Sequence, residues 1–418
     1  MFKRYSILFF LMCSPLIFAQ TIDEKTIEPK QDSIKKKELL QSIGNGYLPS
    51  KYFNIDLRYL IKFNQYEGIR TGLGGETNNT FSEKVRFNTY LVYGFIDHRF
   101  KYSFGGGIRL AEKTKTWLNL SYTDDLQETG STKFLTDKRF FQFFEPRLLN
   151  IDLFHKHITK SIALEHEITP NLISETEFAV SNINPTYNYS YAVNNTTTLD
   201  AFHLSTAKIA LQWSPFENGS DAFKNEYPKF TFQYTKSFKD VFGSDFGFSK
   251  LDFRTIQKIG NKDHSFSEIT LVSGIARGST PLTHLYHAYP NNITKETILQ
   301  RFSVAGLNSF ETMYFNEFFS DKFATLQLKH FIKPFNISER FKPQLVLISR
   351  FAIGDMKSPE KHQNVTFGSL KKGYTESGFE LNKLLFGFGL SFTYRYGAYH
   401  LPEFGDNIAF KFTFNVSL

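Results

Sequence analysis

Charged side chains of both signs stand at regular positions within segments that alternate between apolar and polar residues. Glu376 and Glu380 share one parity of such a segment, and Arg395 and Lys411 stand at the same parity of the next two. Opposite charges that face one enclosed space can bridge across it, or they can line a path that selects ions or solutes. A static salt-bridge network explains the same charges without transport and is the simpler interpretation. The candidate residues for either role are Arg70, Asp321, Lys329, Glu376, Glu380, Arg395 and Lys411.

Other side chains of catalytic or metal-binding type lack the spacing that such chemistry needs. The groups His155-Lys156-His157 and His284-Leu285-Tyr286-His287 come nearest to metal-ligand spacing, but no carboxylate is placed to complete either set. Serines and histidines occur without a motif that predicts a catalytic triad, and no glycine-rich phosphate loop opens a helix. We therefore interpret these histidines as loop residues and expect no catalytic residue, no metal site and no cofactor.

The charged candidates belong to segments of about ten residues with period-two alternation, which predicts β-strands. In the last segment one face is wholly apolar, while the other carries small, polar and charged residues. The apolar face holds Ile408, Phe410, Phe412, Phe414, Val416 and Leu418, and the other face holds Ala409, Lys411, Thr413, Asn415 and Ser417. Residues 386–396 repeat this pattern, and residues 86–95 do so less strictly.

Composition and strand length indicate that these strands cross a membrane. The chain has 17% aromatic residues, with 48 Phe and 21 Tyr, and aromatic girdles are typical of membrane barrels. After the first twenty residues no apolar run is long enough for a membrane-spanning helix, and the mean hydropathy is −0.31. A soluble β-sandwich also alternates, but the polar inner residues and the aromatic terminal strand favour the membrane.

We therefore predict an all-β fold, a transmembrane antiparallel β-barrel of about 14 to 16 strands with long outer loops and short periplasmic turns. Closure is expected because an open sheet edge would leave backbone groups unpaired in lipid. The segments near 157–182 and 374–384 give the weakest strand patterns. We expect outer loops at 128–156, 183–199, 214–228, 277–300 and 354–373, and periplasmic turns at Ile96–Arg99 and Thr169–Asn171.

The first residues predict export from the cytoplasm. Lys3 and Arg4 precede an apolar stretch from Tyr5 to Phe18, which ends at Ala19, as in a secretory signal peptide. Cys13 follows the bulky Met12, so lipidation is not expected, and cleavage after Ala19 removes the only cysteine. The predicted organisation is a signal peptide at residues 1–19, a short periplasmic tail at 20–50 and an outer-membrane barrel at 51–418.

Four stretches of the predicted barrel resemble one family. The string Phe63–Asn78, the string Tyr93–Tyr102, residues 311–321 and the string Gly373–Asn382 are similar to uncharacterised Bacteroidota outer-membrane barrels, usually labelled carboxypeptidase-regulatory-like domain-containing proteins. The resemblance implies the fold and the cell outer membrane as the location. It implies no activity, because the family's own function is unsettled. Members typically carry a periplasmic immunoglobulin-like domain before the barrel, for which residues 20–50 leave no room.

Three functional hypotheses remain open. The first is a non-enzymatic outer-membrane barrel that passes a solute or assists the assembly or export of another envelope component. The second is an outer-membrane lipid hydrolase or acyl-modifying enzyme, and the third is a structural or adhesive barrel that binds partners through its outer loops. The expected partners are outer-membrane lipid, the barrel-assembly machinery during insertion and an unidentified envelope protein. Without Lys3 and Arg4 the 49 basic residues outnumber the 41 acidic ones by only 6, so no nucleic acid is expected.

Overall fold

The structure is a computed structural model, in which residues 43, 46–135, 137, 146–216, 227–261, 264–296, 303–306, 308–338, 341–385 and 388–414 are described. The predicted signal peptide, most of the predicted tail and the end of the last predicted strand, at Val416 and Leu418, lie outside the described residues. Within the described residues no helix is both long and apolar enough to cross a membrane.

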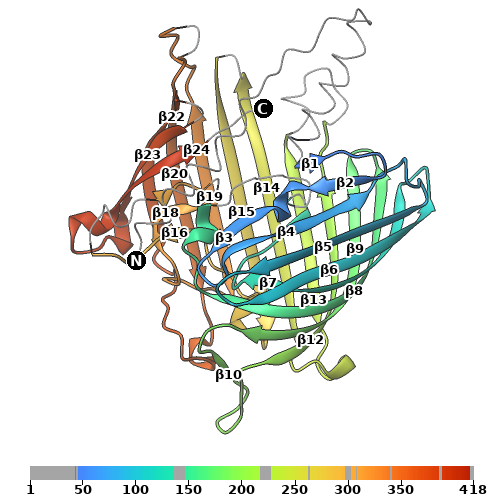
Figure 1. Ribbon diagram of the computed structural model, residues 1–418. Coiled ribbons are helices and arrows are strands. Elements are labelled where there is room, and N and C mark those ends of the chain that lie inside the picture. The colour runs from blue at the N-terminus through green and yellow to red at the C-terminus, as the bar shows by residue number, and fades with distance from the viewer. Residues whose placement is uncertain are drawn as a thin grey trace, which may run out of the picture. The chain divides into compact units, whose positions relative to one another are not determined.

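One large sheet of nineteen strands contains most of the described residues (Figure 1). Its N-terminal strands are β1 (Tyr47–Leu48), β2 (Phe53–Asp56), β3 (Ile61–Asn64), β4 (Gly68–Thr77), β5 (Val85–Gly94), β6 (Arg99–Ala111), β7 (Thr116–Glu128), β8 (Phe154–Thr169) and β9 (Leu172–Pro185). The remaining ones are β12 (Phe202–Trp213), β13 (Lys229–Ser237), β14 (Phe248–Asn261), β15 (Ser265–Gly278), β17 (Ser303–Val304), β19 (Lys322–Phe331), β20 (Gln344–Asp355), β22 (Tyr374–Leu385), β23 (Phe388–Tyr396) and β24 (Ile408–Phe414).

Successive strands of this sheet pair antiparallel, and the sheet curves so that β4–β8 lie in front of β13–β15 in Figure 1. The strands β1 and β17 are only two residues long, and β2 and β3 both pair with β4 as halves of one strand interrupted by the 3-10 helix η1 (Leu57–Tyr59). The described wall therefore has sixteen strands, within the predicted 14 to 16. The two weakest sequence patterns correspond to β8, β9 and β22.

The two faces of the wall differ as the alternation predicts. In β24, Phe410 and Phe412 are 40% and 41% exposed, while the alternate residues Lys411 and Thr413 are 1% and 4% exposed. The same contrast recurs in β4 and β22, where Ile69, Leu73 and Phe379 are exposed on the outer face. A wall whose large apolar side chains point outward and whose charges point inward is the pattern of a barrel in lipid.

Most short connections lie at one end of the wall and most long ones at the other, but several do not follow this rule. Alternate strands end at the same side, so the turn at 95–98 shares its end with the long connections at 129–153, 186–201 and 356–373. The connection 214–228 shares the other end with the turn at residues 170–171. The predicted sides of Ile96–Arg99 and of 214–228 were therefore wrong relative to their neighbours, because strand direction and not loop length decides the side.

Short elements occupy the long connections. These are η3 (Pro146–Leu149), β10 (Ser190–Ala192), β11 (Thr198–Leu199), η4 (Val241–Gly243), η5 (Leu282–His284), β16 (Pro290–Asn292), β18 (Phe310–Tyr314), η6 (Pro359–Lys361), β21 (His362–Gln363), η7 (Gly397–Tyr399) and η8 (Phe404–Asn407). The strands β10, β11 and β21 form a small sheet of their own.

The connection between β15 and β19 (residues 279–321) is here called the inward segment, and residues of its described part pack against the inner face of the wall. Its strands β16 and β18 pair in parallel, and β17 pairs in parallel with β24. Within the segment Phe310 and Met313 are 0% and 1% exposed, and they pack with Ala352 and Tyr374 of the wall. The described part of the predicted outer loop at 277–300 thus folds inward, because its apolar side chains, such as Leu282, Leu285 and Tyr286, are buried there.

Candidate functional site

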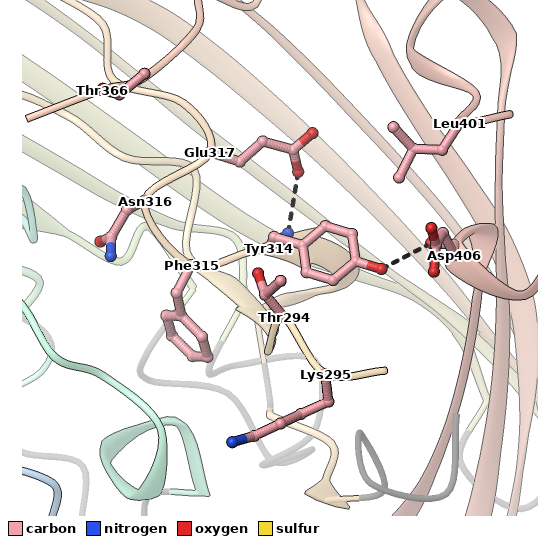
Figure 2. Close-up of a pocket in the computed structure, with 9 residues that line it drawn as sticks. All are labelled: Thr294, Lys295, Tyr314, Phe315, Asn316, Glu317, Thr366, Leu401 and Asp406. Atoms are coloured by element: carbon pink, nitrogen blue, oxygen red, sulfur yellow. Dashed lines mark hydrogen bonds between the residues drawn. The ribbon is translucent and has the colours of Figure 1, made fainter. Parts of the chain in front are cut away.

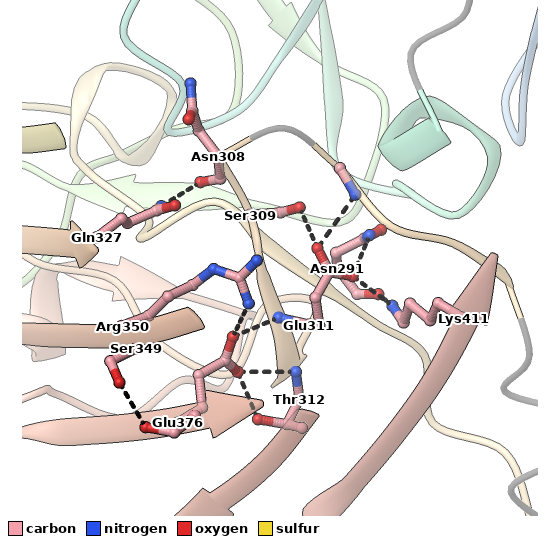
Figure 3. Close-up of polar contacts among 12 residues, drawn as sticks. Asn291, Asn308, Ser309, Glu311, Thr312, Gln327, Ser349, Arg350, Glu376 and Lys411 are labelled. Carbon is pink, nitrogen blue, oxygen red and sulfur yellow. Dashed lines mark hydrogen bonds and ion pairs between the residues drawn. The ribbon is translucent and has the colours of Figure 1, made fainter. Parts of the chain in front are cut away.

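Glu376 of β22 is the centre of a buried polar network on the inner face (Figure 3). Its carboxylate is 0% exposed and accepts hydrogen bonds from the backbone N–H groups of Glu311 at 2.9 Å and Thr312 at 3.0 Å. The Thr312 hydroxyl donates to it at 2.5 Å, and the Arg350 guanidinium donates at 2.7 Å. Arg350 stands directly opposite Glu376 in the pairing of β20 with β22. The wall thus supplies the ion pair, and the inward segment supplies the other donors.

Glu311 of the inward segment is the second buried carboxylate of this network. It lies 3.2 Å from the Lys411 ammonium group, and it accepts hydrogen bonds from Asn291 at 2.8 Å and from Ser309 at 2.6 Å. Burial raises the pKa of Glu311, but Lys411 and Arg350 outweigh burial and hold it below its ordinary value near 4.5. We call Glu311, Thr312, Arg350, Glu376 and Lys411 the segment network.

Arg395 of β23 ties the end of the inward segment to the wall. Its guanidinium is 1% exposed and makes two hydrogen bonds to Glu317, at 2.6 and 3.1 Å. It also lies 4.8 Å from the centre of the Tyr374 ring. Arg395 stands opposite Glu376 in the pairing of β22 with β23, so Arg350, Glu376 and Arg395 form a row across three strands.

Two further candidates form a neighbouring pair, and one lies apart. Lys329 of β19 is 3.6 Å from Glu380 of β22, which also accepts a hydrogen bond from Asn382 at 3.1 Å. Asp321 is half-buried just before β19 and accepts a hydrogen bond from the backbone N–H of Lys357 at 2.8 Å. Asp321 therefore belongs to a loop contact.

Arg70 belongs to a different cluster, far along the wall from Glu376. It pairs with Asp125 through two contacts of 2.6 and 2.8 Å and lies 3.5 Å from Glu67. Lys101 completes the cluster with contacts of 2.6 Å to both Glu67 and Asp97. We call Glu67, Arg70, Lys101 and Asp125 the wall network, because its members lie on β4, β6, β7 and the turn before β4.

A pocket of about 430 Å³ opens between the inward segment and two neighbouring loops (Figure 2). Its lining residues are Thr294, Lys295, Tyr314, Phe315, Asn316, Glu317, Thr366, Leu401 and Asp406. The Tyr314 hydroxyl donates to the backbone oxygen of Asp406 at 3.3 Å, and Glu317 accepts from the Tyr314 N–H at 3.0 Å. The pocket is open to solvent and its polar groups already serve the contact between segment and loops.

The two histidine groups meet in space. The His155 ring centre lies 6.4 Å from that of His157 and 6.2 Å from that of His284, while His287 contacts Glu128 at 2.8 Å. His155 and His157 lie in β8 and not in a loop, which corrects the prediction for that pair. Nevertheless, among the described residues no group of three or more His, Cys, Asp or Glu could hold a metal ion.

Parity indicated the inner-face charges, but it missed the residues that the inward segment contributes. Arg350 could have been found, since it stands on the inner parity of β20 with Val346 and Ile348. Glu311 and Glu317 lie in no long alternating run, and their only sequence signal is the family-like string at 311–321. Lys101 and Asp125 stand in alternating strands that the sequence pattern did not single out.

Solved structures with similar folds are outer-membrane barrels. BamA from Haemophilus ducreyi lacking POTRA domains 1–3 matches with a TM-score of 0.54 and 11% identity over 94% of this chain and 79% of that chain. CdiB from Escherichia coli matches with a TM-score of 0.45 and 8% identity over 84% of this chain and 60% of its own. OmpT, an outer membrane protein of Vibrio cholerae, matches with a TM-score of 0.31 and 8% identity over 80% of this chain and 97% of its own.

At these identities the likeness establishes the fold alone, and it agrees with the two faces of the wall. The fold shared with BamA and the exposed apolar face of the wall together show an all-β outer-membrane barrel, whose location is the cell outer membrane. No curated protein matches the chain. The family model for the C-terminal domain of DUF5686, a family of unknown function, matches residues 42–312. The chain therefore belongs to this family.

Proposed function

We propose that this protein is a non-enzymatic, gated outer-membrane barrel that handles envelope traffic, by assisting the assembly or export of another envelope component. In this proposal the inward segment is the gate. The observation that supports it is the segment network, in which buried charges of the wall are satisfied by groups of a connecting segment and not by the wall alone. A purely structural lumen can pair its charges between wall strands, as the wall network does.

The contacts of the inward segment argue against a permanently open pore. Phe310 and Met313 of the segment pack against the wall, and Glu311 and Glu317 form ion pairs with side chains of the wall. Solute passage along this side therefore requires the segment to move. We retain passage of a solute as a variant of the proposal, in which the moving segment controls conductance instead of exposing a surface.

A structural or adhesive barrel is the second candidate, favoured by the packed inner face. That hypothesis also expects apolar loop tips, and Phe242 of η4 and Phe404 of η8 are 72% and 67% exposed. The hairpin between β10 and β11 instead carries the exposed polar residues 194–197. One observation favours the lipid-hydrolase hypothesis: the Ser267 hydroxyl lies 2.9 Å from Nδ1 of His330, which stands opposite it in the pairing of β15 with β19. A hydrolase also needs a polar partner that orients the histidine, and no described contact joins a carboxylate to His330.

The partners in this proposal are outer-membrane lipid around the exposed aromatic face, the barrel-assembly machinery during insertion and an envelope protein as cargo. A signal peptide at residues 1–19 delivers the chain to the envelope. The strings shared with carboxypeptidase-regulatory-like Bacteroidota barrels support an origin in that group, which sequencing of the source genome would test.

Single-channel conductance in planar bilayers tests the gate directly. Glu376→Ala removes the acceptor at the centre of the segment network, and Arg70→Ala is the matched control because it removes a charge from the wall network. We expect steady conductance for Glu376→Ala and unchanged, mostly closed traces for Arg70→Ala. Val304 and Phe412 are paired across β17 and β24, so Val304→Cys with Phe412→Cys can form a disulfide that fixes the inward segment to the wall. Adding both substitutions to Glu376→Ala should abolish its conductance until a reductant is added. A silent Glu376→Ala barrel with verified insertion would refute the gate.

A further inference from the structure

Several side chains of the wall contact the main chain of the inward segment. Both carboxylate oxygens of Glu376 accept from consecutive backbone N–H groups, those of Glu311 and Thr312 (Figure 3). The Gln327 amide donates to the backbone oxygen of Asn308 at 2.6 Å, and the Lys411 ammonium group donates to the backbone oxygen of Asn291. Three strands, β19, β22 and β24, thus present polar groups to the main chain of the inward segment, and Arg350 of β20 donates a hydrogen bond to Glu376.

The edge of β24 adds main-chain contacts of its own. Ser303 and Val304 pair in parallel with Lys411 and Phe412, and the backbone N–H of Ala305 donates to the backbone oxygen of Phe412 at 2.7 Å. Residues 310–314 are likewise extended, as β18. The edge of β24 and the inner face therefore each contact one extended piece of polypeptide through its backbone N–H and C=O groups.

From these contacts we propose that the inner face formed by Gln327, Arg350, Glu376 and Lys411 is a binding surface for an extended polypeptide, which the inward segment occupies until cargo replaces it. This inference rests on the proposed gate and names its cargo as unfolded or extended polypeptide. Because the contacts address backbone N–H and C=O groups, recognition is largely independent of sequence. Two side-chain preferences add to this: a carboxylate at the position of Glu311, 3.2 Å from the Lys411 ammonium group, and a hydroxyl at the position of Thr312. The Thr312 Oγ1 lies 2.5 Å from Glu376 and 2.7 Å from the Tyr374 hydroxyl.

Replacement by cargo follows from the burial of the charges. Glu376 and Arg350 are both 0% exposed, and a buried charge that loses its hydrogen-bond partners is strongly disfavoured. When the inward segment leaves, another donor must replace the two N–H groups at Glu376. An arriving peptide offers the same groups in the same spacing, so exchange is easier than simple release.

A capped peptide with the sequence of residues 308–314 tests this surface, using the full-length protein in lipid nanodiscs and fluorescence anisotropy. A released variant, Glu311→Ala with Glu317→Ala, weakens the segment while leaving every group of the proposed surface in place. We expect it to bind the peptide at least tenfold more tightly than the unaltered protein. Adding the Val304→Cys and Phe412→Cys pair should abolish binding under oxidising conditions and restore it on reduction.

Two modified peptides separate main-chain recognition from recognition of a sequence. A peptide N-methylated at the residues equivalent to Glu311 and Thr312 lacks both donors to Glu376 and should bind at least tenfold more weakly. A peptide that keeps glutamate and threonine at these two positions and scrambles the other residues should bind within threefold of the parent. Equal binding of the N-methylated peptide, or loss of binding by the scrambled one, would overturn the proposal. A released variant that conducts ions but binds no peptide would refute the polypeptide cargo alone, whereas one that neither conducts nor binds would refute the gate as well.

Discussion

The segment network and the wall network are both buried sets of opposite charges on the inner face, but they differ in what they join. In the wall network, Arg70 and Asp125 belong to β4 and β7, so its contacts stay within one part of the wall. In the segment network, Glu376 of the wall holds the main chain of residues 311 and 312, which lie 65 and 64 positions earlier in a connecting segment. A charge pair within the wall stabilises the barrel, whereas a charge held by a loop can be released without unfolding it.

Replacing Glu376 by alanine should have the largest effect on the position of the inward segment. The variant leaves Arg350 without its closest carboxylate, and breaking a buried pair costs about 3 to 5 kcal/mol. With Met313→Cys as a reporter, which is 1% exposed in the folded segment, we expect maleimide labelling to accelerate by about 100-fold or more. Asp125→Ala in the same reporter background should leave the labelling rate within about threefold while lowering the melting temperature. Equal labelling of the two variants would remove the distinction between the networks.

Reversing the buried pair of Glu311 and Lys411 should have the next largest effect. Glu311→Lys places two ammonium groups together, and Lys411→Glu places two carboxylates together, so either substitution should accelerate Met313→Cys labelling by about tenfold or more. The double reversal restores opposite charges and should bring the rate back to within about threefold of the original. Simple additivity of the two substitutions would mean that the 3.2 Å contact carries no coupling.

Lowering the pH should favour release of the inward segment. Burial lowers the pKa of His284 below its ordinary value near 6.5, with Lys250 and His157 acting in the same direction. The held segment therefore keeps His284 neutral, and release is increasingly favoured as pH falls below about 6.5, by at most tenfold per pH unit. The pKa of Glu311 is also lowered in the held state, so its contribution is present above 4.5 and is lost as pH falls through the lowered pKa.

Labelling of Met313→Cys across pH 8 to 4, with pH-corrected maleimide rates, measures this dependence. His284→Phe should flatten the profile between pH 6.5 and 4.5 and retain the rise below it, because Glu311 is unchanged. A flat profile in the parent reporter would show that His284 remains buried when the segment moves.

The smallest effect is expected for Glu317→Ala. The Glu317 side chain is 20% exposed, and partly exposed ion pairs contribute about 1 kcal/mol or less. Arg395 also retains its contact with the Tyr374 ring after the substitution. Labelling of Met313→Cys should therefore accelerate by no more than about fivefold. An effect as large as that of Glu376→Ala would mean that the contact of Glu317 with Arg395, and not the segment network, mainly holds the inward segment in place.

Much of the wall could be predicted because a strand has a period of two. Alternation placed Glu376, Glu380, Arg395 and Lys411 on one parity, and in the structure all four are buried on the inner face. The same rule indicated that Phe410 and Phe412 face outward. Connection ends were predicted less well, since the rule of short turns inside and long loops outside ignores the alternation of strand direction.

Sequence by itself determined which residues form strands and which face of each strand meets lipid, because these depend on local alternation and on the cost of unpaired backbone groups in a membrane. Only the tertiary structure decided what the inner charges contact. Alternation cannot predict that residues 311 and 312 of a connecting segment reach Glu376, since that contact depends on how the connection folds after the wall strands have paired. The partner of a buried charge is therefore a property of the fold, and here it separates a fixed network from a releasable one.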